Sequence, residues 1–187
     1  MNQALIPDKL WVIDQYFEPQ RFQQIKSLYR ESRMPLSMQY DNRVLSDWSH
    51  SAELQQVARE QTDRISELIQ QKLNPQVAYV SLDLSGAHIM MHRLHPDIFV
   101  QCQIVMSDAP AQGMEYAVCI DQNINQNSKT DYEPLEKITE SYVETIAYCP
   151  NTASIYVNQP RRFVGMLNPI PANTVREVLV LSYTRLY

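Results

Sequence analysis

The chain has four histidines, and three of them fall close together. These are His88, His92 and His95, and no histidine follows position 95. His88 and His92 are four residues apart, so in a strand they would share one face and could bind a metal ion with a carboxylate from elsewhere. His95 and Asp97 flank a proline and form an alternative ligand pair. Without a metal, His92 would be a hydrogen-bonded interior histidine, and His95 and Asp97 would be polar residues of a turn.

A second candidate for chemistry is Arg176, near the start of a long apolar segment at residues 175–183. In a strand, Arg176 shares a face with Val178, Val180 and Ser182. If that face is interior, the guanidinium group needs an anion, either a protein carboxylate or the acid group of a ligand. The alternative is a surface arginine. Candidate internal partners are Asp83, Asp97 and Glu115, and candidate cavity-lining tyrosines are Tyr79, Tyr116, Tyr156 and Tyr183.

Two amphipathic helices precede these residues. Residues 10–13 form a short apolar strand, and Glu18-Pro19 starts a helix because proline suits a first helical turn. That helix ends by Pro35, and residues 34–49 read as irregular, with a turn at residues 40–42. A second helix is expected from a cap at Ser51 to Asn74-Pro75, since its apolar residues recur at helical spacing.

After Pro75 the sequence changes to short apolar segments that are typical of strands. A polar stretch at residues 121–137 is predicted to be a loop or a lid. Two helices followed by many strands indicate an α+β fold, in which closure into a jelly-roll barrel removes exposed strand edges. We expect a single domain, with a supporting layer at residues 1–75 and a barrel core at residues 76–187. The strands are expected at residues 77–84, 88–92, 99–106, 114–120, 144–148, 154–157, 163–166 and 175–183.

Composition limits the classes of function. The chain has 187 residues, which is long enough for one domain with a core of its own. Its net charge of −5 argues against a protein that binds nucleic-acid phosphates. Arg161-Arg162 is interpreted as a solvated loop tip. The three cysteines lack zinc or redox spacing and are expected to be buried free thiols of a cytoplasmic protein. No segment resembles a signal peptide or a membrane span. The cysteines are Cys102, Cys119 and Cys149.

Two motifs in the barrel region resemble a known family. The first is Gly86-x-x-Ile89-x-x-His92-x-Leu94-His95-Pro96-Asp97, followed by an apolar strand at residues 100–106. The second is Cys149-Pro150-Asn151, a strand, Phe163-Val164-Gly165-Met166 and then Arg176. Their order resembles that of the 2-oxoglutarate/Fe(II)-dependent oxygenases, in the style of the small prolyl-hydroxylase-like branch. The resemblance covers nearly the whole chain and implies a double-stranded β-helix, a cupin-like barrel with supporting helices at its N-terminal side.

The resemblance also implies a ligand set, and this chain departs from it. The family holds iron with two histidines and one carboxylate. His92 matches the first histidine, but Leu94 stands at the carboxylate position and Val164 at the distal histidine position. Arg176 matches the arginine that binds the distal carboxylate of 2-oxoglutarate, and Tyr183 is predicted to join it in binding the cofactor. Neither leucine nor valine coordinates a metal, so the resemblance implies a degenerate iron site.

Two functions remain open from the sequence. The first is a non-catalytic or metal-independent protein that uses the barrel pocket to bind a small acidic ligand or a protein partner. The second is an active 2-oxoglutarate/Fe(II)-dependent oxygenase or hydroxylase with a displaced ligand set, drawn from His92, His95, Asp97 or His88. 2-Oxoglutarate is a candidate ligand in both, whereas Fe(II) is not expected in the first. No nucleic acid or membrane partner is expected.

Overall fold

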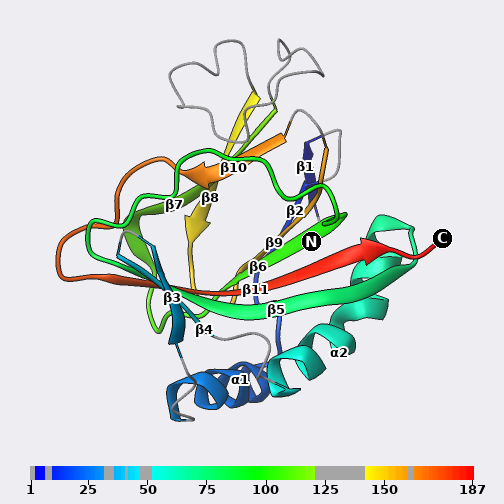
Figure 1. Cartoon of the computed structure of the whole chain (residues 1–187), viewed down its shortest axis with the longest axis horizontal. Coiled ribbons are helices and arrows are strands. Elements are labelled where there is room, and N and C mark those ends of the chain that lie inside the picture. The colour runs from blue at the N-terminus through cyan, green and yellow to red at the C-terminus, as the bar shows by residue number, and fades with distance from the viewer. Residues whose placement is uncertain are drawn as a thin grey trace.

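The fold is a strand sandwich with two helices on one outer face (Figure 1). It is given by a computed structural model, which describes residues 3–6, 10–31, 36–40, 42–46, 52–120, 142–159 and 162–187. The helices are α1 (Pro19–Glu31) and α2 (Ala52–Ile69). The strands are β1 (Gln3–Ile6), β2 (Leu10–Ile13), β3 (Leu36–Tyr40), β4 (Arg43–Ser46), β5 (Leu73–Leu84), β6 (Val100–Val105), β7 (Ala111–Ile120), β8 (Tyr142–Tyr148), β9 (Ala153–Val157), β10 (Arg162–Met166) and β11 (Val175–Arg185).

The strands form two antiparallel sheets that face each other. The larger sheet has the order β1-β2-β9-β6-β11-β5-β4-β3, and the smaller has the order β10-β7-β8. A core cluster joins them, with Val178 and Val180 from the larger sheet packed against Tyr116 and Val164 from the smaller. The sequence prediction of an α+β, double-stranded β-helix fold is confirmed.

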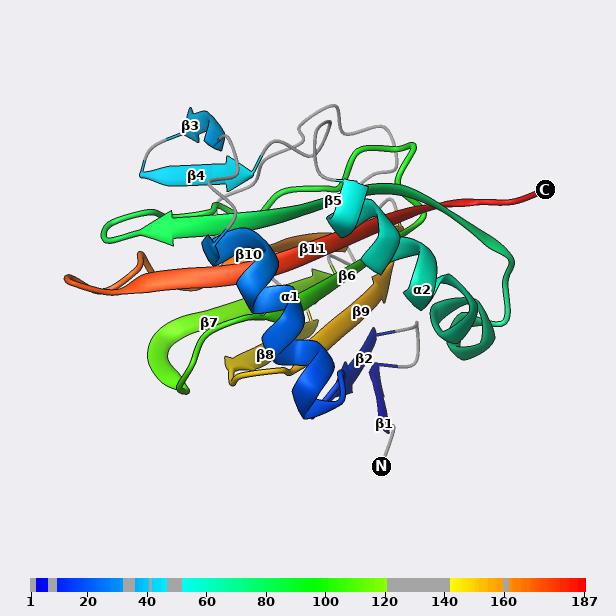
Figure 2. The same ribbon diagram turned by 90° about the horizontal axis from the view of Figure 1, so that it is seen from below.

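Alternation along β11 separates two cores. Leu179, Leu181 and Tyr183 face the helices, whereas Val178 and Val180 face the interior between the sheets. Both helices lie across the same face of the larger sheet, as Figure 2 shows from below. β11 lies between β6 and β5 inside the sheet, and both of its faces are covered, one by the helix-facing core and the other by the smaller sheet, as its continuous apolar sequence predicted.

The N-terminal half differs from the sequence prediction in two places. Residues 34–49 were expected to be irregular, but they contain the hairpin β3–β4, which extends the larger sheet. Asn42 forms the turn with a φ of 66°, a conformation that asparagine tolerates well. Helix α2 ends at Ile69 and not at residue 74, since Gln70 adopts a left-handed conformation with a φ of 57°. Pro75 lies inside β5, beside an irregularity in β11.

Two predictions in the barrel are corrected. Residues 88–92 do not form a strand; His92 makes only an isolated bridge with Val164. Arg162 is a buried residue of β10 and not part of a loop tip, and its Nη1 donates to the carbonyl oxygen of Val157. The predicted lid at residues 121–137, the cap at Ser51 and the side chain of Arg161 lie outside the described residues.

The cysteines and the helices bear on two further predictions. Cys102 and Cys119 are buried free thiols, as predicted, while the thiol of Cys149 is free but only partly buried. Within the described ranges, neither helix is long and apolar enough to cross a bilayer.

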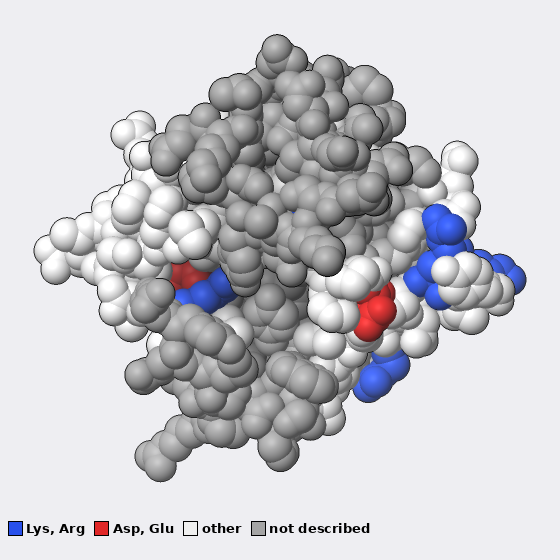
Figure 3. All heavy atoms as spheres, turned by 45° about the horizontal axis from the view of Figure 1, so that its top comes forward, with Lys and Arg blue, Asp and Glu red and all other residues white. Residues whose placement is uncertain are grey.

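On the face shown in Figure 3, basic side chains gather at one margin of the molecule, and an acidic side chain lies beside them.

Candidate functional site

A small cavity lies between the two sheets, on the interior face of β11. Its volume is about 40 Å³, and four strands of the larger sheet and β7 of the smaller contribute to its wall. Polar side chains dominate this wall, which is unusual for the interior of a barrel. The lining residues are Arg43, Tyr79, Ile89, His92, Gln101, Gln103, Tyr116, Arg176, Val178 and Val180.

Arg176 is interior and is paired with Asp83, one of the three carboxylates proposed from the sequence. The two residues are direct cross-strand partners on β11 and β5, and Nη1 lies 2.9 Å from Oδ2. Asp97 and Glu115, the other two candidates, are not partners of Arg176. Arg176 and Asp83 are only 3% and 0% exposed, so the pair is isolated from solvent screening.

Arg43 approaches the same carboxylate from the other side. It stands opposite Asp83 on β4, and its Nε lies 2.9 Å from Oδ1 of Asp83. Ser81 completes the arrangement, because its hydroxyl accepts from Arg43 Nε and donates to Oδ1 of Asp83 at 2.8 Å. Three neighbouring strands thus present a row of two guanidinium groups with one carboxylate between them.

Two tyrosine rings pack against Arg176. Its Cζ lies 5.3 Å from the ring centre of Tyr116 and 5.8 Å from that of Tyr148, which is within cation–π range. The Nε of Arg176 is buried without a hydrogen-bond partner among the described atoms. A buried N–H of a charged group without a partner is uncommon, so this donor is available to a small ligand or a water molecule.

A neutral hydrogen-bonded network forms another part of the wall. The hydroxyl of Tyr156 donates to Oε1 of Gln101 and accepts from Nε2 of Gln103 at 2.8 Å. Burial raises the pKa of the Tyr79, Tyr116 and Tyr156 phenols, so these groups stay protonated and add no negative charge. Of the tyrosines proposed from the sequence, Tyr79 and Tyr116 line the cavity, and Tyr156 supports it.

Tyr183 lies elsewhere. It follows the irregularity in β11, packs in the helix-facing core and donates its hydroxyl hydrogen to the carbonyl oxygen of Ala58 at 3.0 Å. The alternation of the strand therefore puts Tyr183 on the face opposite the cavity. The structure does not bring it together with Arg176, contrary to the predicted cofactor-binding pair.

The three positions that correspond to iron ligands in the resembling family lie near one another. His92 and Val164 exchange both backbone hydrogen bonds, each at 2.9 Å, so they form a hydrogen-bonded antiparallel pair. In such a pair the side chains are neighbours on one face, with Cβ atoms about 4.5–5.5 Å apart. Val164 and Leu94 both pack in the core between the sheets. Of these three side chains only that of His92 can coordinate a metal.

His92 itself is held as a neutral imidazole. Its Nδ1 lies 3.0 Å from the carbonyl oxygen of Met90. Burial lowers the pKa of His92, and the positive charge of Arg43 lowers it further. His92 is therefore hydrogen-bonded within the chain, as the interpretation of an interior histidine expects, and whether it binds a metal stays a prediction.

The displaced ligand sets are not assembled in the described part of the chain. His95 and Asp97 are 67% and 70% exposed, and Nδ1 of the histidine lies 3.5 Å from Oδ2 of the aspartate. His88 contacts the carbonyl oxygen of Met166 at 3.2 Å. No three histidine, cysteine, aspartate or glutamate residues gather as a metal site among the residues that the structure describes.

Gly165 explains why residues 89–92 can lie against β10. A Cβ atom at this position would stand 2.8 Å from the carbonyl oxygens of Ile89 and Met90 and from the amide nitrogen of Met91. Any larger residue would push the segment away from β10 and would move His92 relative to Val164. The glycine is thus required by a close backbone approach, in agreement with its place in the sequence motif.

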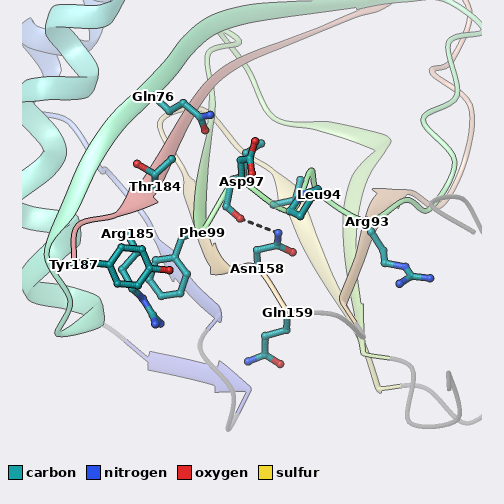
Figure 4. Close-up of a pocket in the computed structure, with 12 residues that line it drawn as sticks. Gln76, Arg93, Leu94, Asp97, Phe99, Asn158, Gln159, Thr184, Arg185 and Tyr187 are labelled. Atoms are coloured by element: carbon teal, nitrogen blue, oxygen red, sulfur yellow. Dashed lines mark hydrogen bonds between the residues drawn. The ribbon is translucent and has the colours of Figure 1, made fainter. Parts of the chain in front are cut away.

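A larger groove, of about 820 Å³, opens beside Leu94 (Figure 4). Arg93 and Arg185 lie at opposite sides of it, and Cζ of Arg185 lies 4.1 Å from the ring centre of Phe99. Asn158 donates to the carbonyl oxygen of Ile98 at 2.8 Å and ties the 93–99 segment to the end of β9. The sequence did not reveal this groove, because its lining residues come from segments that are far apart in the chain. The lining residues are Gln76, Arg93, Leu94, Pro96, Asp97, Ile98, Phe99, Asn158, Gln159, Thr184, Arg185 and Tyr187.

Comparison with known proteins identifies the fold. No protein-family model and no curated protein sequence matches the chain. Among solved structures, it is similar to HygX from Streptomyces hygroscopicus with nickel, 2-oxoglutarate and hygromycin B bound (TM-score 0.69, 10% identity, 95% of this chain and 83% of that one). It is also similar to a 2OG-Fe(II) oxygenase family oxidoreductase from Burkholderia pseudomallei (TM-score 0.66, 14% identity, 95% and 84%).

A third similar structure is a prolyl hydroxylase from Trichoplax adhaerens in complex with a hypoxia inducible factor peptide fragment (TM-score 0.64, 11% identity, 96% and 84%). At these identities the comparisons show the fold alone. The fold is that of the 2-oxoglutarate/Fe(II) oxygenases, as the sequence motifs predicted.

Proposed function

We propose that this chain is a non-catalytic member of the oxygenase fold that binds a small anion in its barrel, without iron. The observation that carries the proposal is the row Arg43, Asp83 and Arg176 at a polar cavity. Two guanidinium groups and one carboxylate leave one positive charge in excess. This charge is only partly solvated, because Arg176 and Asp83 are buried and Arg43 is 24% exposed. A poorly solvated excess charge is costly unless an anion compensates it, so the cavity favours an anionic ligand.

The positions of Leu94 and Val164 support the non-catalytic part of the proposal. The iron of an oxygenase of this type needs two imidazoles and a carboxylate on one side of the metal. In this chain, aliphatic side chains fill two of those positions and pack into the core. The donor set therefore does not fit Fe(II).

2-Oxoglutarate fits the cavity less well than a smaller acid does. A volume of about 40 Å³ has room for roughly three water-sized groups, and 2-oxoglutarate is much larger. Asp83 already accepts from Nη1 of Arg176, so a distal carboxylate at this nitrogen would compete with Asp83. The acid ligand expected from the sequence is therefore better represented by a carboxylate such as formate. Binding of a protein partner remains a prediction.

Formate binding tests the proposal. We expect saturable binding of formate to the wild-type protein, measured by calorimetry and by shifts in the NMR signals of the cavity residues. Arg43→Gln, at a position that is 24% exposed, should weaken binding at least about tenfold, a loss of about 1.4 kcal/mol. Arg185→Gln is the matched control, because that arginine lies in the groove and outside the cavity. Formate that does not bind, or that binds Arg43→Gln and wild type equally, would contradict the proposal.

A further inference from the structure

We infer that Asp83 makes the barrel cavity selective for small monovalent anions and excludes dicarboxylates. The inference rests on the proposed anion-binding function and names its substrate class. Asp83 stands directly opposite Arg176, at the place where the acid group of a ligand would otherwise meet the guanidinium. The protein thus supplies one carboxylate of its own to the arginines.

The hydrogen bonds of Asp83 hold it firmly in this place. Oδ2 accepts from Arg176 at 2.9 Å, while Oδ1 accepts from the hydroxyl of Ser81 and lies 2.9 Å from Nε of Arg43. The side chain of Asp83 is completely buried. Removing it from these partners would leave a buried carboxylate uncompensated, so a ligand is not expected to displace it.

The charges of the cavity set the valence of its ligand. Arg43 and Arg176 contribute two positive charges and Asp83 one negative charge, which leaves one positive charge among the described residues. His92 adds none, because burial keeps its imidazole neutral. A monovalent anion compensates the excess charge, whereas a divalent anion would leave a net negative charge in a buried place.

The size and the donors of the cavity limit the ligand further. Room for roughly three water-sized groups limits the ligand to an anion of a few non-hydrogen atoms, in the size range from formate to oxamate. Arg176 lines this cavity, and its Nε–H is buried without a hydrogen-bond partner among the described atoms. Planar oxyanions such as formate, acetate, nitrate and hydrogencarbonate suit a guanidinium donor, which binds such groups in its plane.

Ligand pairs that differ in charge but little in shape test the inference. Oxamate and oxalate form one such pair, and formate serves as the smallest probe. We expect formate and oxamate to bind the wild-type protein, and oxalate to bind at least about tenfold more weakly than oxamate. In Asp83→Asn, which keeps the shape of the side chain, the preference for oxamate over oxalate should fall at least about tenfold. Asp97→Asn is the matched control, because Asp97 is exposed and lies outside the cavity.

The outcomes separate this inference from the proposed function. Equal affinities of oxamate and oxalate for the wild type would overturn the inference and leave anion binding intact. An unchanged preference in a folded Asp83→Asn variant would overturn it as well. If that variant does not fold, the wild-type comparison decides alone. If neither formate nor oxamate binds wild type, the proposed function itself fails.

Discussion

Two substitutions should convert this barrel into a metal-binding protein. Leu94→Asp and Val164→His together supply the carboxylate and the second imidazole that accompany His92 in the resembling family. The backbone pairing of His92 with Val164 supports this expectation, since both hydrogen bonds are 2.9 Å long and place the two side chains on one face. Cβ atoms about 4.5–5.5 Å apart let two imidazoles reach one metal ion. Residue 94 lies two positions beyond His92, which favours the same face in an extended chain.

The size of the effect follows from burial and from linkage. Val164 is almost completely buried, so an imidazole there without metal should lower the free energy of unfolding by about 1–3 kcal/mol. A metal ion at about 100 times its dissociation constant should then restore about 2.7 kcal/mol, because it binds the folded state. Wild type should gain much less from the same ion, because among positions 92, 94 and 164 only His92 offers a ligand atom.

Thermal unfolding with and without Ni²⁺, together with the visible spectrum of the Co²⁺ form, measures this gain. The single variants Leu94→Asp and Val164→His are controls, and a triple variant with His92→Ala tests whether His92 is a ligand. A folded double variant that binds neither ion would refute the alignment of these positions. Equal binding by the triple variant would refute the role of His92.

Three further predictions concern stability and reactivity. Asp83→Ala leaves Arg176 without its carboxylate partner, so it should lower the free energy of unfolding by about 3–5 kcal/mol in a denaturant titration. The control Glu60→Ala removes an ion pair near the surface and should lower that free energy by less than about 1 kcal/mol. Gly165→Ala should cost about 1–3 kcal/mol or more, since its Cβ would meet backbone atoms at 2.8 Å; unchanged stability would contradict the close approach. Of the three thiols, only that of Cys149 should react readily with a thiol reagent in the native protein. Cys102 and Cys119 are fully buried, and burial raises the pKa of the Cys102 thiol.

Much of the fold could be predicted from the sequence because its periodicities are strong. The alternation of β11 put Arg176 on one face with Val178 and Val180 and left open whether that face is interior; the structure shows that it is. Burial of that face then required a carboxylate, and Asp83 was among the three proposed. The motif that ends in Gly165 carried the resemblance to the oxygenases, and the fold comparisons agree with it.

Other features depend on tertiary contacts that local patterns do not encode. The β3–β4 hairpin is stabilised by its pairing with β5, which residues 34–49 alone do not reveal. Leu73 continues the apolar spacing of α2, but it belongs to β5 because it pairs with Arg185 at the end of β11. Residues 88–92 were expected to form a strand, yet His92 makes only an isolated bridge with Val164.

The site was predicted in part for the same reason. The sequence indicated an arginine, a histidine and two aliphatic replacements, but it did not indicate that Arg43 shares the carboxylate of Asp83. That contact depends on the unpredicted hairpin. Tyr183 was predicted to line the cavity and to join Arg176 in binding the cofactor, whereas strand alternation turns it toward α2. The small volume of the cavity follows from side-chain packing, which no sequence pattern gives.

We propose that this protein has the oxygenase fold but does not bind iron. Anaerobic titration of the wild-type protein with Fe(II) and 2-oxoglutarate, followed by metal analysis and visible spectroscopy, measures iron binding directly. Leu94 and Val164 at the ligand positions predict no stoichiometric iron and no charge-transfer band of an iron–2-oxoglutarate complex. One iron per chain, with that band, would contradict the account.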